Sequence, residues 1–354
     1  MKADLQDAAR LAGLIVRRVS GRRCPFFVQL MTTERCNLTC RYCYAEFGSR
    51  RRPDFPLEPL LKVIDGLARM GTGFIMLAGG EPMLRQDIGQ IIDRIKLRGM
   101  RSSLNTNGLM VPRRLDEIAR ADMLSISLDG PPDIHDFYRG DRAYEQALEA
   151  IVAARKRGIR VQIQFTLTRD LARAFNHVDS IAKEWGCFIG INFLRPQEKI
   201  DGGRVAAAEA PDSEIGDFLD RLIQNPRRTL PYPSHILRYV RRWPYGFGRH
   251  LIVDSGDLKG FRPIPCQSGR YLIAIDNRGD IFPCTKLFYT TPLGNCLDGD
   301  IERAWRKLKP VDCQACLDLG CNLINDLLHF NPKALAGLFN NWRSTGRQEC
   351  AGGK

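Results

Sequence analysis

Short apolar runs alternate with longer amphipathic stretches between residues 26 and 196, and this alternation predicts the fold. The apolar runs are typical of strands and comprise Phe26–Thr32, Phe74–Ala78, Ser102–Asn105, Met123–Leu128, Val161–Leu167 and Phe188–Leu194. The stretches between them repeat apolar residues at helical spacing and predict helices at Leu57–Met70, Gln86–Arg98, Arg113–Ala121, Tyr144–Arg157 and Phe175–Trp185. Strands that alternate with helices predict repeated βαβ units around a parallel sheet.

The predicted fold class is α/β, with an open, partial (β/α)6 TIM-like barrel over residues 26–196. Six strands are too few to close an eight-stranded barrel. In parallel α/β folds, ligands lie at the carboxyl ends of the strands. We therefore expect residues that directly follow a predicted strand to form the functional site.

The rest of the chain has a different character. Residues 1–25 contain an amphipathic helix, Asp4–Val19, with a basic end that fits either packing on the body of the protein or contact with an anionic membrane. Residues 197–262 are rich in proline and aromatic residues and predict a crossing segment with a helix at Ser213–Gln224. Residues 263–354 predict a small α+β domain, in which a hairpin (Tyr271–Ile275 and Asp280–Pro283) precedes a tail helix at Leu327–Trp342.

Composition narrows the class of protein. The content of apolar (44%) and charged (26%) residues is typical of a soluble globular protein, and no apolar run approaches the roughly 18 residues that span a bilayer. The N-terminus lacks the features of a signal peptide, so a cytoplasmic location is expected. The net charge of +13 favours anionic partners, although a solvated basic surface explains it equally well. The 12 cysteines are clustered, which favours metal binding over disulfides.

Three cysteines follow the first predicted strand: Cys36, Cys40 and Cys43, in a C-x3-C-x2-C arrangement. A loop that leaves a strand can wrap three thiolates around one metal centre, and cysteine thiolates hold iron–sulfur clusters. Three ligands leave one position open, as working metal sites do. A zinc loop or simple burial is the alternative, but no fourth Cys or His lies nearby.

Polar groups follow the later strands as well. Gly79-Gly80-Glu81-Pro82 ends the second strand, where glycines permit close backbone approach and the carboxylate can accept bonds from an amine. Asn107, Ser127 and Thr166 stand at the ends of the third, fourth and fifth strands, and Arg139 can pair a ligand carboxylate. Ordinary turn chemistry is the simpler explanation for these residue types.

Together these segments resemble the radical S-adenosylmethionine (radical SAM) superfamily over residues 26–196. The resemblance implies that Cys36, Cys40 and Cys43 hold a SAM-binding [4Fe–4S] cluster. It places Tyr42 beside the adenine, Gly79, Gly80, Glu81 and Pro82 at the methionine amino group, and Ser127 and Arg139 at the ribose and carboxylate. Asn107 and Thr166 are expected to bind the cofactor as well, from their positions at strand ends. The resemblance also implies reductive cleavage of SAM to a 5′-deoxyadenosyl radical that abstracts a substrate hydrogen.

The C-terminal part resembles the SPASM/twitch extension of that superfamily, which carries auxiliary iron–sulfur clusters. The resemblance implies at least one auxiliary [4Fe–4S] cluster, held by four of Cys266, Cys284, Cys313, Cys316 and Cys321. Asn325 stands where the two-cluster form has a further cysteine, which favours a single auxiliary cluster. Cys24, Cys187 and Cys350 are expected to carry no metal.

The expected function is radical SAM modification of a small-molecule or lipid-like metabolite, with a flavodoxin- or ferredoxin-type electron donor and no nucleic-acid partner. Peptide maturation that forms a crosslink or thioether is the alternative, and a non-catalytic metal-binding protein is the alternative of another class. The acidic residues Asp201, Asp254 and Asp276 are candidates for a general base only by position. The sequence leaves open the hydrogen that is removed, the product and the oligomeric state.

Overall fold

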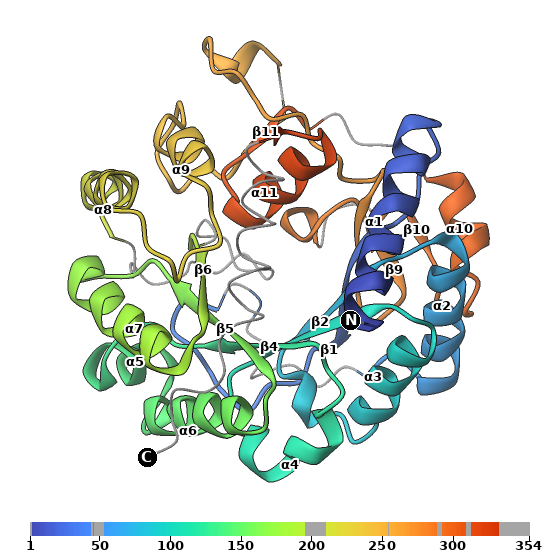
Figure 1. Cartoon of the computed structure of the whole chain (residues 1–354), viewed down its shortest axis with the longest axis horizontal. Coiled ribbons are helices and arrows are strands. Elements are labelled where there is room, and N and C mark those ends of the chain that lie inside the picture. Colours follow the sequence, from blue (N-terminus) through green and yellow to red (C-terminus); the bar gives the residue numbers. More distant parts are fainter. Residues whose placement is uncertain are drawn as a thin grey trace.

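A curved sheet of nine strands forms the centre of the computed structural model (Figure 1). The model describes residues 2–43, 45, 53–194, 210–253, 255–288, 292–308 and 313–332. Within these ranges the strand order is β10-β9-β8-β1-β2-β3-β4-β5-β6. The bounds are β1 Phe27–Thr33, β2 Phe74–Gly79, β3 Arg101–Thr106, β4 Met123–Ser127, β5 Arg160–Thr166, β6 Phe188–Asn192, β8 Leu272–Ile275, β9 Asp280–Phe282 and β10 Gly294–Asn295. Strands β1 to β6 are parallel neighbours, so the predicted open α/β barrel is confirmed.

Helices cover the outer face of this sheet and pack on their neighbours around the barrel (Figure 1). They are α2 Leu57–Met70, α3 Ile88–Leu97, α4 Val111–Ile118, α5 Pro132–Arg139, α6 Ala143–Lys156 and α7 Leu171–Trp185. The predicted helix at Leu57–Met70 is confirmed to the residue. Helix α5 was not predicted, because it is only eight residues long and follows directly on a proline pair, Pro131 at the cap and Pro132 at its first position.

Alternation along each strand separates the packed core from the inner face of the sheet. On β1, Val28 and Leu30 belong to the core beneath the helices, whereas Gln29 has the opposite parity and faces inward. The same alternation on β4 puts Leu124 and Ile126 into that core and turns Ser125 inward. The inner face is therefore the side on which the strand ends present their polar residues.

The C-terminal part extends the barrel sheet. Strand β8 pairs in parallel with β1, from Phe27 opposite Leu272 to Leu30 opposite Ile275. The predicted hairpin then continues the sheet through β9 and β10. The boundaries at residues 196 and 262 stay a prediction, but one sheet crosses them.

The remaining α-helices and strands pack around the ends and edges of the sheet (Figure 1). They are α1 Lys2–Val19, α8 Asp212–Gln224, α9 Ser234–Arg241, β7 Leu251–Ile252, α10 Ile301–Lys307, β11 Ala315–Cys316 and α11 Leu319–Leu328. Helix α11 ends at Leu328, so the start of the predicted tail helix at Leu327 is wrong; residues 333–342 lie outside the described ranges. The wrong start has a physical reason, since Asp318 caps a helix that begins earlier and Phe330 has a positive φ of 56°.

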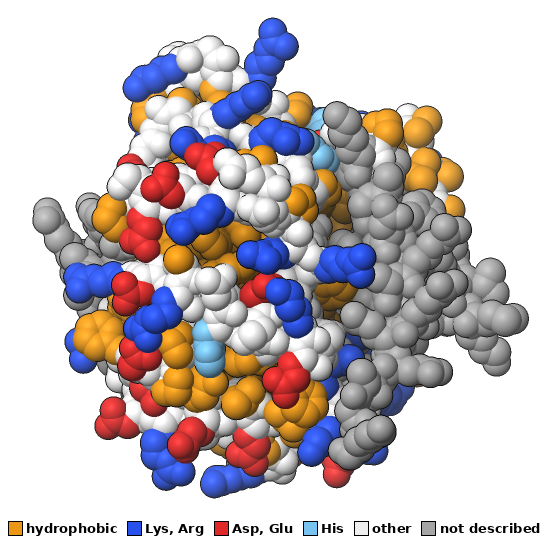
Figure 2. Space-filling model, turned by 60° about the vertical axis from the view of Figure 1, so that its left-hand side comes forward, with side chains coloured by type: hydrophobic (Ala, Val, Ile, Leu, Met, Phe, Trp, Pro, Cys, Tyr) orange, Lys and Arg blue, Asp and Glu red, His pale blue; other side chains and the backbone are white. Residues whose placement is uncertain are grey.

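The surface mixes charges of both signs. Figure 2 shows Lys and Arg side chains spread among Asp and Glu side chains on the face that carries α5, α7 and α8. Arg173 on α7 and Asp133 on α5 form one such exposed ion pair. Among the described helices, none combines the length and hydropathy needed to cross a bilayer.

Candidate active site

The three clustered cysteines lie on the loop that leaves β1. Their side chains are half-buried, and the backbone N–H of Cys43 donates to the carbonyl of Cys40 (3.0 Å), which curls the loop. Burial raises the pKa of the Cys36 thiol to about 12, and the neighbouring Cys40 and Cys43 add to this rise. Burial also raises the pKa of Cys40. Thiolates that lie close together in a half-buried loop repel one another. A cationic iron–sulfur centre offsets this repulsion, so the three cysteines are a suitable donor set for it.

Two glycines let the end of β2 lie directly against this loop. A Cβ on Gly79 would meet the carbonyl oxygen of Thr33 at 2.2 Å, and a Cβ on Gly80 would meet that of Arg35 at 2.2 Å. The backbone N–H groups of Gly80 and Glu81 donate to the carbonyls of Thr33 (2.9 Å) and Arg35 (2.7 Å). The sequence predicted close approach to a ligand; the structure shows close approach to the cysteine loop itself.

Glu81 joins the second and third strand ends. Its carboxylate is fully buried and accepts bonds from the Thr106 hydroxyl (2.8 Å), the Asn107 N–H (2.7 Å) and the Met83 N–H (3.0 Å). Burial raises the pKa of Glu81 to about 7, although these three donors oppose the rise. A buried carboxylate of this kind gains from a nearby cation, as the methionine amine of SAM would be.

Two further contacts tie the cysteine loop to the strand ends. The side-chain amide of Asn107 donates to that of Asn37 (2.8 Å), which lies between the first two cysteines. The backbone N–H of Arg41 donates to the carbonyl of Tyr138 on α5 (2.8 Å). The loop is thus fixed from both the β3 and the α5 side.

Asp129 is the centre of the opposite half of the site. Its fully buried carboxylate accepts bonds from the Tyr42 hydroxyl (2.5 Å), the Arg139 guanidinium (2.5 Å) and the Thr166 N–H (3.0 Å). Burial alone would raise the pKa of Asp129, but Arg139 and the Tyr42 hydroxyl hold it below its usual value. Asp129 was not predicted as a site residue, although it lies two residues beyond the predicted Ser127; Ser127 itself ends β4 on the inner face.

Five C-terminal thiols gather in a second group. The Cys313 thiol donates to Cys266 and thereby lowers the pKa of Cys266 to about 6, while the pKa of Cys313 rises. The other three thiols are Cys284, Cys316 and Cys321. Burial raises the pKa of each, and the charge of at least one neighbouring thiol of the group raises it further. All five predicted auxiliary residues therefore lie together, one more than a four-cysteine cluster needs.

Asn325 has a defined place beside this group. Its side-chain oxygen accepts the N–H of Gln267 (3.0 Å), and its amide also contacts the Cys266 thiol. Asp318 caps α11 by accepting the N–H of Cys321 (2.8 Å) and pairs with Lys286 (3.0 Å). A structural amide therefore occupies the position of the missing cysteine.

Three other cysteines lie within the described residues. Cys24 and Cys187 are buried. Cys296, which the sequence analysis did not consider, is also buried and donates to the carbonyl of Gly279 (3.3 Å). Cys350 lies outside the described residues.

The candidate general bases receive no support from geometry. Asp201 and Asp254 lie outside the described residues. Asp276 is fully buried and accepts the N–H groups of Arg278 and Asp280 (2.9 Å each), so its carboxylate closes its own hairpin turn.

Within the described ranges, no three His, Cys, Asp or Glu side chains converge on a position for one metal ion. In a four-iron cluster each cysteine takes a separate iron, so the thiols need only face a common centre.

A family comparison decides what this arrangement is. The model of the "Radical SAM superfamily" matches residues 30–171, which contain the cysteine loop, the Glu81 turn and the Asp129 centre. Residues 30–171 of this chain form a radical SAM domain. Its cofactors are accordingly SAM and a [4Fe–4S] cluster.

Curated relatives of this radical SAM enzyme extend over most of its length. It is 27% identical to the AdoMet-dependent heme synthase of Oleidesulfovibrio alaskensis over 287 residues, which cover 78% of this chain and 73% of that protein. It is also 27% identical to the mycofactocin maturase MftC of Mycobacterium tuberculosis over 302 residues, which cover 83% and 73%.

A solved structure supports the fold. Streptococcus suis SuiB bound to S-adenosylmethionine superposes with a TM-score of 0.61 at 15% identity, covering 80% of this chain. This chain spans 66% of the length of the SuiB chain, so the likeness concerns the architecture alone.

Proposed function

We propose that this radical SAM enzyme removes a hydrogen atom from a substrate held against the inner face of its sheet. The observation that carries the proposal is the convergence of the cysteine loop, the Glu81 turn and the Asp129 centre on one edge of the sheet, linked by the bond between Asn107 and Asn37. When bound, the reduced cluster and SAM supply one-electron cleavage of the sulfonium C–S bond and, through it, hydrogen-atom abstraction.

The residues of the chain bind and orient SAM in this proposal. Cys36, Cys40 and Cys43 hold the cluster, and the buried carboxylate of Glu81 sits where the methionine amine binds. The Tyr42 ring, fixed by its hydroxyl bond to Asp129, flanks the adenine. Arg139 lies over that ring at 5.4 Å and is held by the same carboxylate, which orients its remaining donors toward the nucleotide.

The strand ends supply the remaining polar contacts. Gly79, Gly80 and Pro82 shape the turn around Glu81, while Asn107, Ser127 and Thr166 offer small neutral groups to the ribose and carboxylate.

The auxiliary thiols hold a second cluster in this proposal. Cys266 and Cys313 lie within hydrogen-bond reach of each other, so one centre can take both thiolates. Cys284, Cys316 and Cys321 provide the other two ligands. Lys286, paired with Asp318 beside them, adds a positive charge near the cluster.

An acidic electron donor of the flavodoxin or ferredoxin type suits the net charge of +13. Three exposed apolar side chains on α1 suit peripheral contact with an anionic membrane; they are Ile15, Val16 and Val19. Flotation with vesicles that contain phosphatidylglycerol tests that contact, and an absence of flotation at low salt would remove it.

The inner face of the sheet favours an uncharged, amide-bearing substrate. The Gln164 amide donates to Ser125 (2.8 Å), the Asn192 amide donates to Gln164 (3.1 Å), and Gly190 leaves room for the side chain of Gln162, which a Cβ there would meet at 2.2 Å. The arginines of matching parity, Arg101 and Arg160, stand at the opposite, amino-terminal ends of β3 and β5. Neutral carboxamides and hydroxyls hydrogen-bond peptide groups well, whereas a tetrapyrrole rich in carboxylates needs cations.

The aromatic segment gives little support for a lipid-like substrate. Trp243 is buried and donates to the carbonyl of Arg249 (2.8 Å), and Phe247 stacks on Phe193 at 5.8 Å. Tyr245 lies beneath the guanidinium of Arg249. These rings are taken up by packing, so peptide modification is the substrate class that we favour, and tetrapyrrole modification is the second candidate because of the heme synthase relatives.

The test begins with anaerobic reconstitution, dithionite reduction and addition of SAM. We expect 5′-deoxyadenosine and methionine from the wild type and from Cys187→Ala, and none from Cys40→Ala. Full output from Cys40→Ala would refute the ligand assignment.

The substrate is then tested with two probes, a precursor peptide encoded beside the gene and an iron coproporphyrin. We expect only the peptide to raise the rate of deoxyadenosine formation and to change in mass. Stimulation by the porphyrin alone would favour the second candidate.

A further inference from the structure

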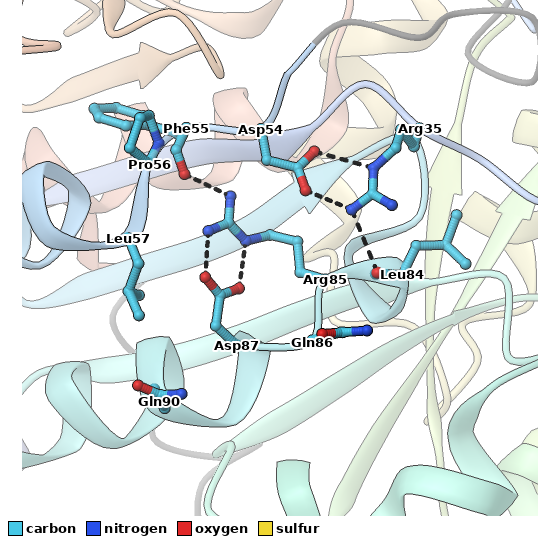
Figure 3. Close-up of a pocket in the computed structure, with 10 residues that line it drawn as sticks. All are labelled: Arg35, Asp54, Phe55, Pro56, Leu57, Leu84, Arg85, Gln86, Asp87 and Gln90. Carbon is cyan, nitrogen blue, oxygen red and sulfur yellow. Dashed lines mark hydrogen bonds and ion pairs between the residues drawn. The ribbon is translucent and has the colours of Figure 1, made fainter.

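Arg85 is a buried cation that lies three residues beyond Pro82, on the segment that carries Glu81. Its side chain is only 2% exposed, yet every nitrogen of the guanidinium has a partner (Figure 3). Two of the nitrogens bind the carboxylate of Asp87, at 2.8 and 2.7 Å. Asp87 stands at the N-cap of α3 but makes no capping bond with its side chain, so its carboxylate serves the guanidinium.

The third nitrogen of Arg85 closes the base of the cysteine loop. Its Nη1 donates to the carbonyl of Thr32 and to the carbonyl of Phe55, both at 2.8 Å. Thr32 precedes the loop that carries Cys36, and Phe55 follows it. One guanidinium therefore holds both ends of a long loop whose closure would otherwise cost conformational entropy.

A second clasp lies beside the first. Arg35 pairs with Asp54, which also accepts the Thr33 hydroxyl (2.5 Å), so the two residues again join the start and the end of the loop. Arg35, Asp54, Phe55 and Arg85 line one pocket of about 510 Å³, in which Figure 3 shows the two guanidinium groups side by side. Arg35 is 40% exposed there, whereas Arg85 is buried, so the inner clasp is the one shielded from water.

We propose that Arg85 is a positioning residue that keeps the cysteine loop in register with the Glu81 turn and so sets the affinity of the cluster site for SAM. This inference rests on the proposed function. SAM must contact the open iron and the Glu81 turn at once, and Arg85 joins the two parts that carry these groups. Residues that orient metal ligands through a second layer of bonds typically change affinity by 10- to 100-fold when altered.

The test compares three variants with the wild type. Arg85→Lys keeps the charge but cannot bind Asp87 with two nitrogens and both carbonyls at once. Asp87→Asn leaves the guanidinium in place and weakens its orientation. Arg94→Lys is the matched control. Arg94 on α3 pairs with Asp65 on α2, at a distance of 2.8 Å between nitrogen and oxygen, and neither residue belongs to the cysteine loop.

Three quantities are measured on each reconstituted protein: the iron content, the melting temperature and the Kd of radiolabelled SAM by equilibrium dialysis. The iron content gives the number of assembled clusters, and the Kd is fitted for those sites only. We expect Arg85→Lys to raise the Kd for SAM about tenfold or more, Asp87→Asn to raise it less, and Arg94→Lys to leave it unchanged. A wild-type Kd in Arg85→Lys would overturn the proposal. If that variant does not fold, wild-type affinity in Asp87→Asn overturns it instead.

The proposed function fails in a different way. If the wild type binds no SAM and forms no deoxyadenosine, the enzyme assignment is wrong. If the wild type does both and the Arg85 variants match it, only the positioning role is wrong.

Discussion

The guanidinium of Arg139 lies 2.5 Å from the carboxylate of Asp129, and both side chains are almost fully shielded from water, at 10% and 0% exposure. A charge buried this deeply is stable only beside its partner, because neutral contacts do not compensate for the free energy lost when the charge leaves water. The pair therefore links the end of β4 to α5 and fixes the half of the site that faces the cysteine loop.

Removing the charge of Asp129 should destabilise the fold strongly. We expect Asp129→Asn to lower the free energy of unfolding by about 3–5 kcal/mol, since Arg139 would remain buried without its partner. Asp133→Asn is the control, because Asp133 pairs with Arg173 at the exposed surface and its loss should leave the free energy of unfolding close to the wild-type value. Chemical denaturation under anaerobic conditions measures both, and equal losses would contradict the argument.

The close approach at Gly80 gives a prediction about cluster assembly. Gly80→Ala puts a methyl group 2.2 Å from the carbonyl of Arg35, so the cysteine loop must shift. We expect a loss of about 2 kcal/mol or more and reduced iron in the SAM-binding cluster.

Gly13→Ala is the matched control for that variant. Gly13 lies inside α1, where nothing would contact the new methyl group within 4 Å, so this substitution should stabilise the protein by up to about 1 kcal/mol. Iron analysis and thermal melting separate the two. Normal iron content in Gly80→Ala would show that the loop tolerates displacement.

Iron content also tests the two thiol groups. Cys313→Ala and Cys36→Ala should each lose about four iron atoms per chain, since each removes a ligand from a different cluster. Cys296→Ala should keep the wild-type content, because this thiol bonds to the carbonyl of Gly279 and stands apart from both groups. Iron lost in Cys296→Ala would make it a ligand and redraw the auxiliary site.

His135 gives a prediction about pH. Its Nδ1 accepts the N–H of Asp129 (3.0 Å), and burial lowers its pKa to about 4. An unfolded histidine has a pKa near 6.5, so between these values the unfolded state binds more protons and stability falls as the pH falls. From pH 7.5 to 5.5 this group should contribute a loss of about 1 kcal/mol.

The variant His135→Asn retains an acceptor near the Asp129 N–H but does not titrate. Urea denaturation at both pH values should show a smaller decrease for this variant than for the wild type. His329→Asn, at a more exposed site, serves as the control. Parallel decreases in all three proteins would show that His135 is not the group responsible.

Local signals in the sequence were enough for much of this description. The strands from β1 to β6 were predicted because a strand shows itself as an apolar run of only a few residues. The cysteine groups were predicted because their members are close together in the sequence. Helix α9 was missed because its eight residues lie in a proline-rich stretch, yet its Tyr239 senses the charges of Cys316, Cys266 and Cys313.

The parts that were missed depend on distant segments. Asp129 looked like a turn residue, and only the fold shows Tyr42, Arg139 and Thr166 around its carboxylate. The glycine pair suggested a ligand, because nothing local indicates that the backbone of Thr33 and Arg35 lies beside it. Such contacts form only after the strands are assembled, so spacing along the chain cannot reveal them.

The pairing of β1 with β8 has a consequence for biosynthesis. Strand β1 is synthesised long before its partner β8, because Val28 pairs with Ile273. Until the ribosome has delivered β8, one side of β1 is a bare strand edge in an otherwise largely formed barrel, and such edges recruit other chains. Slow translation or truncation before residue 272 should therefore yield aggregates rather than a smaller folded enzyme, and co-expressed chaperones should rescue the full-length chain but not the truncated one.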